Sequence, residues 1–368
     1  MRLLVASDKF KGSLRADEAC RAIRDGLAAA LPEADVDLCP IADGGEGTTA
    51  ALVAALGGEW RETRVTDARG RPLLARHGWV GARRLAILEM SAASGLALVA
   101  DLPPDPAQAS TLGTGELLLA AAEGADEVVL GIGGSATNDG GLGMALALGW
   151  TFLRADGTPF RPALANVTEA ARLAPPARPL PAIRVACDVD NPLLGPRGAT
   201  RVYGPQKGVR DFAWFEARLE HLADLARDHL GRDLRDIPGA GAAGGLGFGL
   251  MAFARASLCP GFGLVAGALD LEARLREADL VITGEGRLDR QSLSGKGPGG
   301  VAGMARRLGK PVVAFAGSVE PSAATLFDLA VPISSGGDDV AESMRRAGER
   351  LRASAESHAG EIRLLARG

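Results

Sequence analysis

Lysine is scarce in this 368-residue chain, since only five of its 41 basic residues are lysine. Four of the five, Lys9, Lys11, Lys207 and Lys296, stand in loop-like sequence near glycine. The compact lysine ammonium can approach a phosphate closely where the backbone is flexible. Carboxyl and hydroxyl side chains stand beside these lysines, and the pattern therefore favours a site for phosphate with a divalent metal. The alternative is chance placement on exposed loops.

Cysteine and histidine are also few, with four residues of each. The cysteines are widely spaced and form no C-x-x-C pair, which argues against a disulfide framework and a structural zinc site. His221 and His229 stand on a helix predicted over 212–230, but a spacing of eight residues does not suit a metal pair on one helix face. We therefore expect no imidazole-based catalysis.

Charge imbalance and long apolar runs are absent as well. The formal net charge is -4, with 47% hydrophobic and 23% charged residues, which is an ordinary globular composition that gives no reason to expect a nucleic-acid partner. No run of 18 apolar residues is present, and residues 1–6 suggest a strand rather than a signal peptide. We expect a cytoplasmic protein, monomer or homodimer, whose partners are small molecules and not membranes.

The length favours two domains with a cleft between them. Near both chain ends, short apolar strands precede glycine-rich turns and helices rich in Ala and Leu, which is typical of parallel α/β sheets. Residues 61–90 instead contain three β segments with no helix between them, which indicates a meander. We predict an α/β fold of two α/β domains. A doubly wound, Rossmann-like parallel-sheet domain is built from 1–60 and 278–368, and a mixed α/β domain is inserted at 61–277.

Glycine is abundant, with 50 residues. The densest run, at 133–141, follows a strand predicted at 127–132 and precedes a helix. Backbone amides exposed by such a turn, together with the helix dipole, make an anion site. Similar runs stand at 43–48, 111–116 and 239–249. Each run taken alone is equally well explained by tight turns and close helix packing.

Three common nucleotide-binding motifs are incomplete or absent in this sequence. Residues 131–136 resemble a dinucleotide fingerprint, but no acidic residue closes a second strand about twenty positions further on. Lys296 lacks the upstream Gly and the following Ser or Thr of a Walker A loop. No His-Arg-Asp loop of protein kinases is present. ATP would therefore have to be held in a different manner.

Carboxylates stand at or just beyond the ends of predicted strands, where open α/β sheets bind ligands. They are Asp8, Asp43, Asp139, Asp188, Asp190 and Asp289. Magnesium takes one or two carboxylates together with phosphate oxygens, and phosphoryl transfer to an alcohol uses a further carboxylate as proton acceptor. Each acid taken singly is also explained as a cap or turn residue.

Eight runs, in register along the chain, resemble the type-1 glycerate kinase family of bacteria. They are SDKFKGSL (7–14), ADGGEGT (42–48), GTGE (113–116), GIGGSATNDGG (131–141), ACDVDNPL (186–193), GPQKG (204–208), GAGAAGGLG (239–247) and TGEGRLD (283–289). The resemblance extends to about residue 317. It implies an ATP-dependent kinase that phosphorylates D-glycerate with Mg²⁺, with its active site in the cleft between the domains. Ser7 departs from the family, in which Pro is common.

The resemblance and the residue pattern together assign the site. Glycerate is placed among Asp8, Lys9, Lys11, Asp43, Gly44, Gly45 and Asn191. Catalytic roles fall to Asp190, slightly favoured as the base, and to Asp188, Lys9, Lys11 and Asp43. The ATP phosphates are placed on Gly133, Gly134, Ser135, Thr137 and Asn138, with Lys207 and Lys296 offsetting the developing charge. Magnesium is assigned to Asp188 and Asp190, or to Glu285 and Asp289.

Three points stay open at this stage. We expect 2-phosphoglycerate as the product, with 3-phosphoglycerate as the alternative. An NAD-dependent oxidoreductase of a small hydroxy acid would share the glycine runs. A non-catalytic sugar-acid-binding protein would keep the cleft without group transfer, although the clustered Asp and Lys residues favour the kinase.

Overall fold

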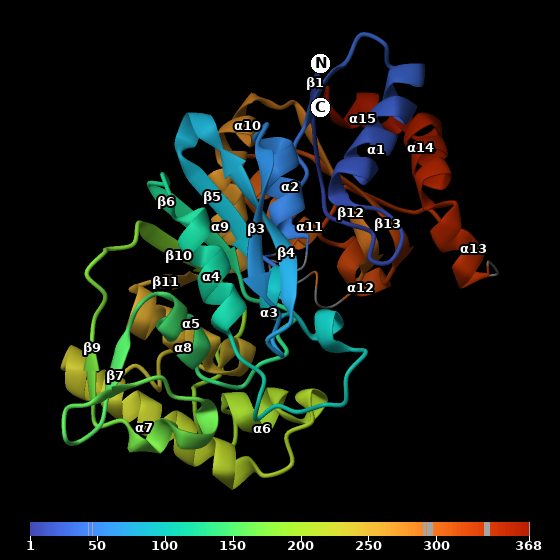
Figure 1. Cartoon of the computed structure of the whole chain (residues 1–368). Coiled ribbons are helices and arrows are strands. Elements are labelled where there is room, and N and C mark those ends of the chain that lie inside the picture. Colours follow the sequence, from blue (N-terminus) through green and yellow to red (C-terminus); the bar gives the residue numbers. More distant parts are fainter. Residues whose placement is uncertain (43, 46, 290–291, 293–296, 335–338, 368) are drawn as a thin grey trace. The chain divides into compact units, whose positions relative to one another are not determined.

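The computed structural model describes residues 1–42, 44–45, 47–289, 292, 297–334 and 339–367. The chain folds into two compact units, each with its own internal packing (Figure 1). Unit 1 comprises Met1–Asp43, Ala50–Gly57 and Gly261–Gly368, and unit 2 comprises Gly44–Thr49 and Gly58–Pro260. Both units are α/β, which confirms the predicted fold class. The domain boundaries inferred from the sequence stay a prediction.

Unit 1 is built around one five-stranded parallel sheet with the order β14-β13-β12-β1-β2 (Figure 1). The strands are β1 (Arg2–Ser7), β2 (Asp35–Leu38), β12 (Leu280–Leu288), β13 (Val312–Val319) and β14 (Leu329–Pro332). β1 and β12 come from opposite ends of the chain and pair with each other, with Leu3 opposite Leu280. The apolar runs of the central strands are buried, as expected for strands covered on both faces.

Helices cover both faces of this sheet. Leu3 and Val5 join a core cluster with residues of α1 (Ala16–Ala30) and α14 (Ala347–Ser357), whereas Leu4, between them, is buried on the opposite face. The helices α10 (Leu271–Glu277) and α11 (Gly297–Arg307) also contact β1. They cover the opposite face, and the sheet is therefore doubly wound. The remaining helices of the unit are α9 (Gly261–Ala268), α12 (Pro321–Ala324), α13 (Val340–Arg345) and α15 (Ala359–Leu365).

Unit 2 contains a six-stranded sheet with the order β11-β10-β6-β5-β4-β3. Its strands are β3 (Glu59–Thr66), β4 (Pro72–Val80), β5 (Leu85–Glu89), β6 (Glu127–Gly131), β10 (Ala182–Ala186) and β11 (Ser257–Cys259). β3, β4 and β5 follow one another as antiparallel neighbours, which confirms the predicted meander. The strands from β5 to β11 pair in parallel. A small separate sheet joins β8 (Pro159–Phe160), β7 (Thr151–Leu153) and β9 (Arg172–Ala174).

The helices of unit 2 complete its core. They include α3 (Ser91–Ser94), α4 (Leu112–Ala121), α5 (Leu142–Ala147), α6 (Ala199–Tyr203), α7 (Phe212–Leu230) and α8 (Ala242–Ala254), while α2 (Thr48–Ala55) spans the two units. In the described part of the chain, no helix is both long enough and apolar enough to cross a lipid bilayer.

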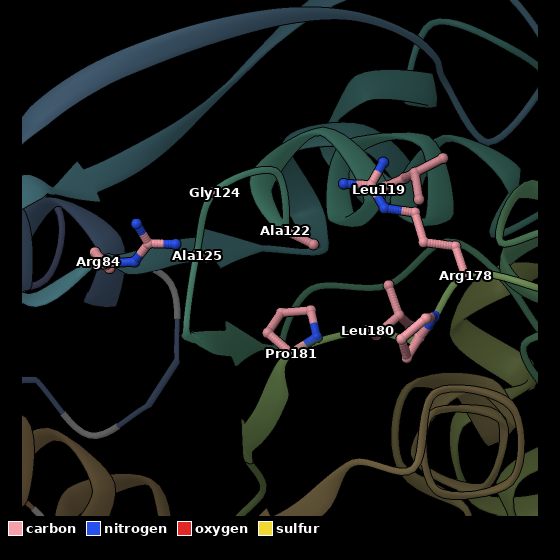
Figure 2. A pocket seen from close by; sticks show the side chains of 9 residues that line it. Arg84, Leu119, Ala122, Gly124, Ala125, Arg178, Leu180 and Pro181 are labelled. Carbon is pink, nitrogen blue, oxygen red and sulfur yellow. The ribbon is translucent and has the colours of Figure 1, made fainter.

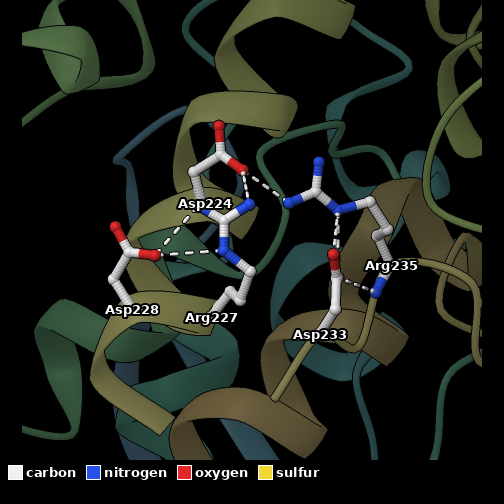
Figure 3. Close-up of polar contacts among 5 residues, drawn as sticks. All are labelled: Asp224, Arg227, Asp228, Asp233 and Arg235. Carbon is white, nitrogen blue, oxygen red and sulfur yellow. Dashed lines mark hydrogen bonds and ion pairs between the residues drawn. The ribbon is translucent and has the colours of Figure 1, made fainter. Parts of the chain in front are cut away.

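An ion-pair network closes the connection between α7 and α8 (Figure 3). Arg235 donates to Asp224 at 2.6 Å and to Asp233 at 2.9 Å, and Arg227 pairs with both Asp224 and Asp228. Arg235 is the most buried of the five residues, so solvent screens its two ion pairs less than those of Arg227. The network therefore fixes the segment that precedes the glycine-rich start of α8.

Candidate active site

The glycine-rich turn 133–141 connects β6 to α5 in unit 2. Gly134, Gly140 and Gly141 have φ angles of +74°, +64° and +80°, which glycine adopts without steric cost. The turn packs against the start of α8, where the Gly140 amide donates to the Gly244 carbonyl at 3.1 Å. A Cβ at Gly244 would lie 1.9 Å from the carbonyl oxygen of Thr137. Two of the four predicted glycine runs are therefore in direct backbone contact.

Asp139 fixes the turn from within. Its buried carboxylate accepts hydrogen bonds from the amide and hydroxyl of Thr111, and from the amides of Gly141 and Gly143, at 2.8 to 3.2 Å. Burial raises the pKa of Asp139, and the four donors oppose that rise. The Thr111 hydroxyl in turn accepts from the Met144 amide at 2.9 Å. Sequence reasoning noted Asp139 as a strand-end acid without giving it a role, and the structure shows that it ties a third glycine run to the turn.

Lys207, at the end of the 3-10 helix η4 (Pro205–Lys207), contacts the same turn. Its side chain is 3% exposed, and its Nζ donates to Ser135 Oγ and to the Thr137 carbonyl, both at 2.6 Å. Burial lowers the pKa of Lys207 to about 7, although the charge of Asp139 acts in the opposite direction. The lysine is thus a buried support of the turn and not a solvated cation on a surface loop.

Two buried polar atoms of the turn have no hydrogen-bond partner among the residues that the structure describes. They are Asn138 Oδ1 and Thr137 Oγ1, in side chains that are fully buried. The Asn138 amide nitrogen is used, because it donates to Thr200 Oγ1 at 3.0 Å. Gly133 and Gly134, by contrast, are exposed. The structure therefore brings Lys207 together with the five turn residues that were predicted to bind ATP. Lys296 lies outside the described residues.

Ala186 at the end of β10 pairs with Gly131 at the end of β6. The acidic segment after β10 and the 133–141 turn therefore both begin at the carboxyl-terminal ends of these parallel strands. Asp188 and Asp190 are both exposed, and Asp190 forms an ion pair with Arg197 at 2.9 Å. Asn191 Nδ2 donates to the Arg197 carbonyl. Further polar contacts hold this asparagine: Tyr203 Oη donates to Asn191 Oδ1 at 2.6 Å, and the Gly241 amide donates to the Asn191 carbonyl at 2.9 Å.

In unit 1 the predicted substrate residues follow β1. The strand order changes direction between β1 and β12, which is where open α/β sheets bind ligands. The amide of the buried Asp8 donates to the Gly284 carbonyl at 2.8 Å, and its carboxylate accepts from the Lys9 amide at 2.6 Å. Lys11 is exposed, and a Cβ at Gly286 would lie 3.2 Å from its amide nitrogen.

The second carboxylate pair also belongs to unit 1. Ser292 Oγ donates to Glu285 at 2.6 Å, and the Ser292 amide donates to the Asp289 carbonyl at 3.1 Å. Among the described residues, no group of three or more His, Cys, Asp or Glu side chains is arranged to hold a metal. Magnesium usually takes only one or two protein carboxylates, so the donor types of Glu285 and Asp289 fit such an ion.

Gly44 and Gly45 group with unit 2, whereas Asp43 lies outside the described residues. The Gly44 carbonyl is near the end of β6, since a Cβ at Gly131 would lie 3.3 Å from it. Gly45 closes the start of α2, where its carbonyl accepts from Thr48 Oγ1 at 2.6 Å. Gly44 is therefore packed beside the strand that leads into the 133–141 turn.

A separate pocket of about 250 Å³ lies at the opposite edge of the unit 2 sheet (Figure 2). Arg84 and Pro181, which immediately precede β5 and β10, line it together with Leu119 and Arg178. It therefore lies at the amino ends of the parallel strands and contains none of the predicted site residues. The sequence offered no signal for this pocket.

Comparison with known proteins decides the family. The model of the Glycerate kinase family matches residues 3–363. The chain belongs to the glycerate kinase family. A glycerate kinase from Bacillus subtilis (strain 168) is 42% identical, over 99% of this chain and 98% of its own length. A glycerate 2-kinase from Escherichia coli (strain K12) is 45% identical, over 87% of this chain and 86% of its own.

A solved structure agrees with the family assignment. A crystal structure from Salmonella typhimurium LT2, provisionally named glycerate kinase 2, is similar with a TM-score of 0.90 and 39% identity, covering 99% of this chain and 98% of that one. The family resemblance inferred from the eight sequence runs is confirmed. As a member of the glycerate kinase family the chain is an ATP-dependent kinase, which decides against the oxidoreductase and the non-catalytic binding protein.

Proposed function

We propose that this enzyme transfers the γ-phosphoryl group of ATP to the 2-hydroxyl of D-glycerate, giving 2-phosphoglycerate, with Mg²⁺ as the metal. The observation that carries the proposal is the 133–141 turn, which combines exposed glycines with buried, unpartnered polar atoms and a buried lysine. The similarity to the E. coli glycerate 2-kinase supports the 2-position over the 3-position.

The ATP phosphates bind to the turn in this proposal. Exposed glycines let phosphate oxygens approach backbone amides, which a side chain would obstruct. Gly133 and Gly134 are the exposed part of the turn, and Ser135, Thr137 and Asn138 form its buried part. The Thr137 hydroxyl, which has no partner among the described residues, is a donor that a phosphate oxygen could use. Lys296 is proposed as a further phosphate contact from the segment outside the described residues.

The glycerate carboxylate needs a cation, and its two hydroxyl groups need carboxylate or amide partners. We assign Lys9 and Lys11 to the carboxylate because they follow the switch-point strand β1. Asp8, Asn191 and Asp43 are assigned to the hydroxyl groups, with the backbone of Gly44 and Gly45 beside them.

Proton removal from the attacking hydroxyl is assigned to Asp190, with Asp188 beside it and Asp43 as the alternative. In the structure Asp190 Oδ2 forms an ion pair with Arg197 at 2.9 Å. Magnesium would be held by Asp188 and Asp190 or by Glu285 and Asp289. When bound, it supplies positive charge to the phosphate oxygens.

An assay of ADP formation with ATP, Mg²⁺ and D-glycerate tests the reaction, and phosphorus NMR of the product tests the position. We expect ADP release that depends on D-glycerate and a single product with the phosphate on the 2-oxygen. L-glycerate and an NAD-coupled absorbance assay are the controls. Release that does not depend on D-glycerate would refute the substrate, and a 3-phospho product would refute the position.

Carboxylate-to-amide variants test the base. We expect Asp190→Asn to lower kcat at least about 100-fold, because general-base catalysis contributes about 10² to 10⁴. Turnover within a few-fold of the wild type for Asp190→Asn, combined with loss of turnover for Asp43→Asn, would transfer the role to Asp43. Asp156→Asn, on an exposed turn of unit 2, is the matched control.

A further inference from the structure

Lys207 contacts the 133–141 turn at two points. Its Nζ contacts Ser135 Oγ and the Thr137 carbonyl, which stand two residues apart, so one amino group holds two points of the turn. The backbone that carries it is fixed as well, because the Lys207 amide donates to the Gly204 carbonyl at 2.9 Å. With 3% of its side chain exposed, Lys207 has little freedom to leave this position.

No carboxylate of the described residues lies within ion-pair distance of Lys207. Asp139 is the charged group whose field reaches it, but the oxygens of Asp139 already accept four hydrogen bonds from Thr111, Gly141 and Gly143. A neutral lysine amine has two N–H groups, which match the two acceptors that Nζ contacts. An added proton brings a third N–H and a positive charge that the protein interior leaves without a close counter-ion.

A polyphosphate on the turn changes this balance. Phosphates on the exposed Gly133 and Gly134 would bring negative charge next to Ser135, whose Oγ contacts Nζ, and an opposite charge nearby favours the protonated amine. We propose that Lys207 is a positioning residue of the nucleotide site that takes up a proton when the phosphates of ATP bind to the turn. The inference rests on the proposed function, since it requires the turn to be the phosphate site.

Linkage gives the sign and the pH range. Burial lowers the pKa of Lys207 to about 7, so the neutral amine is accessible near and above neutral pH when no phosphate is bound. Bound phosphate raises that pKa, and nucleotide binding therefore consumes a proton from solvent between the free and the bound pKa. Affinity for nucleotide falls as the pH rises through this range, by up to about tenfold per pH unit.

Calorimetry at pH 8 measures the uptake. MgADP is titrated in two buffers with different heats of ionisation, and we expect the wild type to take up about half to one proton per nucleotide. Lys207→Met should bind with no Lys-linked uptake, and Lys207→Arg should also show none because arginine is always charged. Lys310→Met, at a position remote in sequence from the turn, should behave as the wild type.

A second measurement does not depend on a variant that folds. With only five lysines in the chain, ε-¹³C-lysine labelling gives few signals to follow by NMR. We expect one signal to titrate near pH 7 without nucleotide and above pH 8 with MgADP. Five signals that all titrate near pH 10, or nucleotide binding without proton uptake, would overturn the inference even in an active kinase. Nucleotide-linked uptake without glycerate phosphorylation would instead refute the proposed function alone.

Discussion

Asp139 accepts hydrogen bonds from both the backbone amide and the hydroxyl group of Thr111, at 2.8 and 2.9 Å. The two residues are 28 positions apart, and their contact joins the segment before α4 to the glycine-rich turn before α5. Because the carboxylate is buried, it depends on these donors for its solvation. The turn is therefore held in place by a side chain that has no contact with solvent.

Thr111→Val tests this support. The substitution keeps the shape but removes a donor to Asp139 and the acceptor of the Met144 amide, and we expect the free energy of unfolding to fall by about 2 to 3 kcal/mol. Thr151→Val, at an exposed position of β7, should stay within about 0.5 kcal/mol of the wild type. Urea denaturation compares them, and equal stability of the two variants would contradict the buried network.

Gly244→Ala tests the contact between the turn and α8. Gly244 and Gly231 have nearly the same φ, +69° and +70°, so alanine carries the same backbone strain at both. A Cβ at Gly244 would lie 1.9 Å from the Thr137 carbonyl, whereas no atom of the described residues would lie within 4 Å of one at Gly231. We expect Gly244→Ala to reduce kcat/KM for ATP by about 10- to 100-fold. Similar kinetics for both variants would show that the turn tolerates displacement.

Gly26→Ala tests how the two chain ends pack in unit 1. A Cβ at Gly26 of α1 would lie 2.2 Å from the Arg352 carbonyl of α14, so the helices have to separate. We expect a loss of about 1 to 3 kcal/mol in the free energy of unfolding. Gly360→Ala, on α15 with open space around the added Cβ, should gain about 0.4 to 1 kcal/mol. Thermal denaturation that ranks the variants in the opposite order would refute this packing.

His77 gives a pH dependence of stability. His77 is 3% exposed, and its Nδ1 has no hydrogen-bond partner among the described residues. Burial, with a smaller effect of Arg61, lowers its pKa. The unfolded chain, with a histidine pKa of about 6.5, then binds the proton more readily than the folded one. Stability from neutral His77 is complete above about pH 6.5 and declines below it, by at most about 1.4 kcal/mol per pH unit.

The His77→Gln variant isolates this effect. Its stability should change less than that of the wild type between pH 7 and 5, as measured by urea denaturation at each pH. His358→Gln is the control, because His358 Nδ1 lies 2.9 Å from the Ser354 carbonyl, which accepts hydrogen bonds, and 3.1 Å from Ser357 Oγ. Parallel pH profiles for wild type and His77→Gln would rule out His77 as the source.

Local sequence patterns predicted the strands and turns because they act over short distances. Buried strands are continuous apolar runs, and glycines with positive φ mark where each run ends, as at Gly134 and Gly141. The meander was predictable for the same reason, since no helical period separates its three segments. The parallel sheet built from both chain ends followed from the similar pattern of those two ends.

The contacts of the site depended instead on residues far apart in the chain. The Lys207 amino group contacts Ser135 across 72 positions, and nothing in the run GPQKG distinguishes a buried lysine from an exposed one. Likewise, the sequence around Asp139 gave no sign that Thr111 donates to it. The ion pair of Asp190 with Arg197 is closer in sequence, but it depends on the course of an irregular loop. Burial and pairing of polar groups are set by tertiary packing, which local propensity does not encode.

The pairing of β1 with β12 also has a consequence for biosynthesis. Ser7 Oγ donates to the Gly284 carbonyl across 277 positions, so β1, which is translated well before β12, has no partner on that side until β12 has been made. The continuous segment Gly58–Pro260 is complete before that moment and can condense on its own. Until then β1 keeps an unpaired edge on that side, and an unpaired strand edge is prone to aggregate.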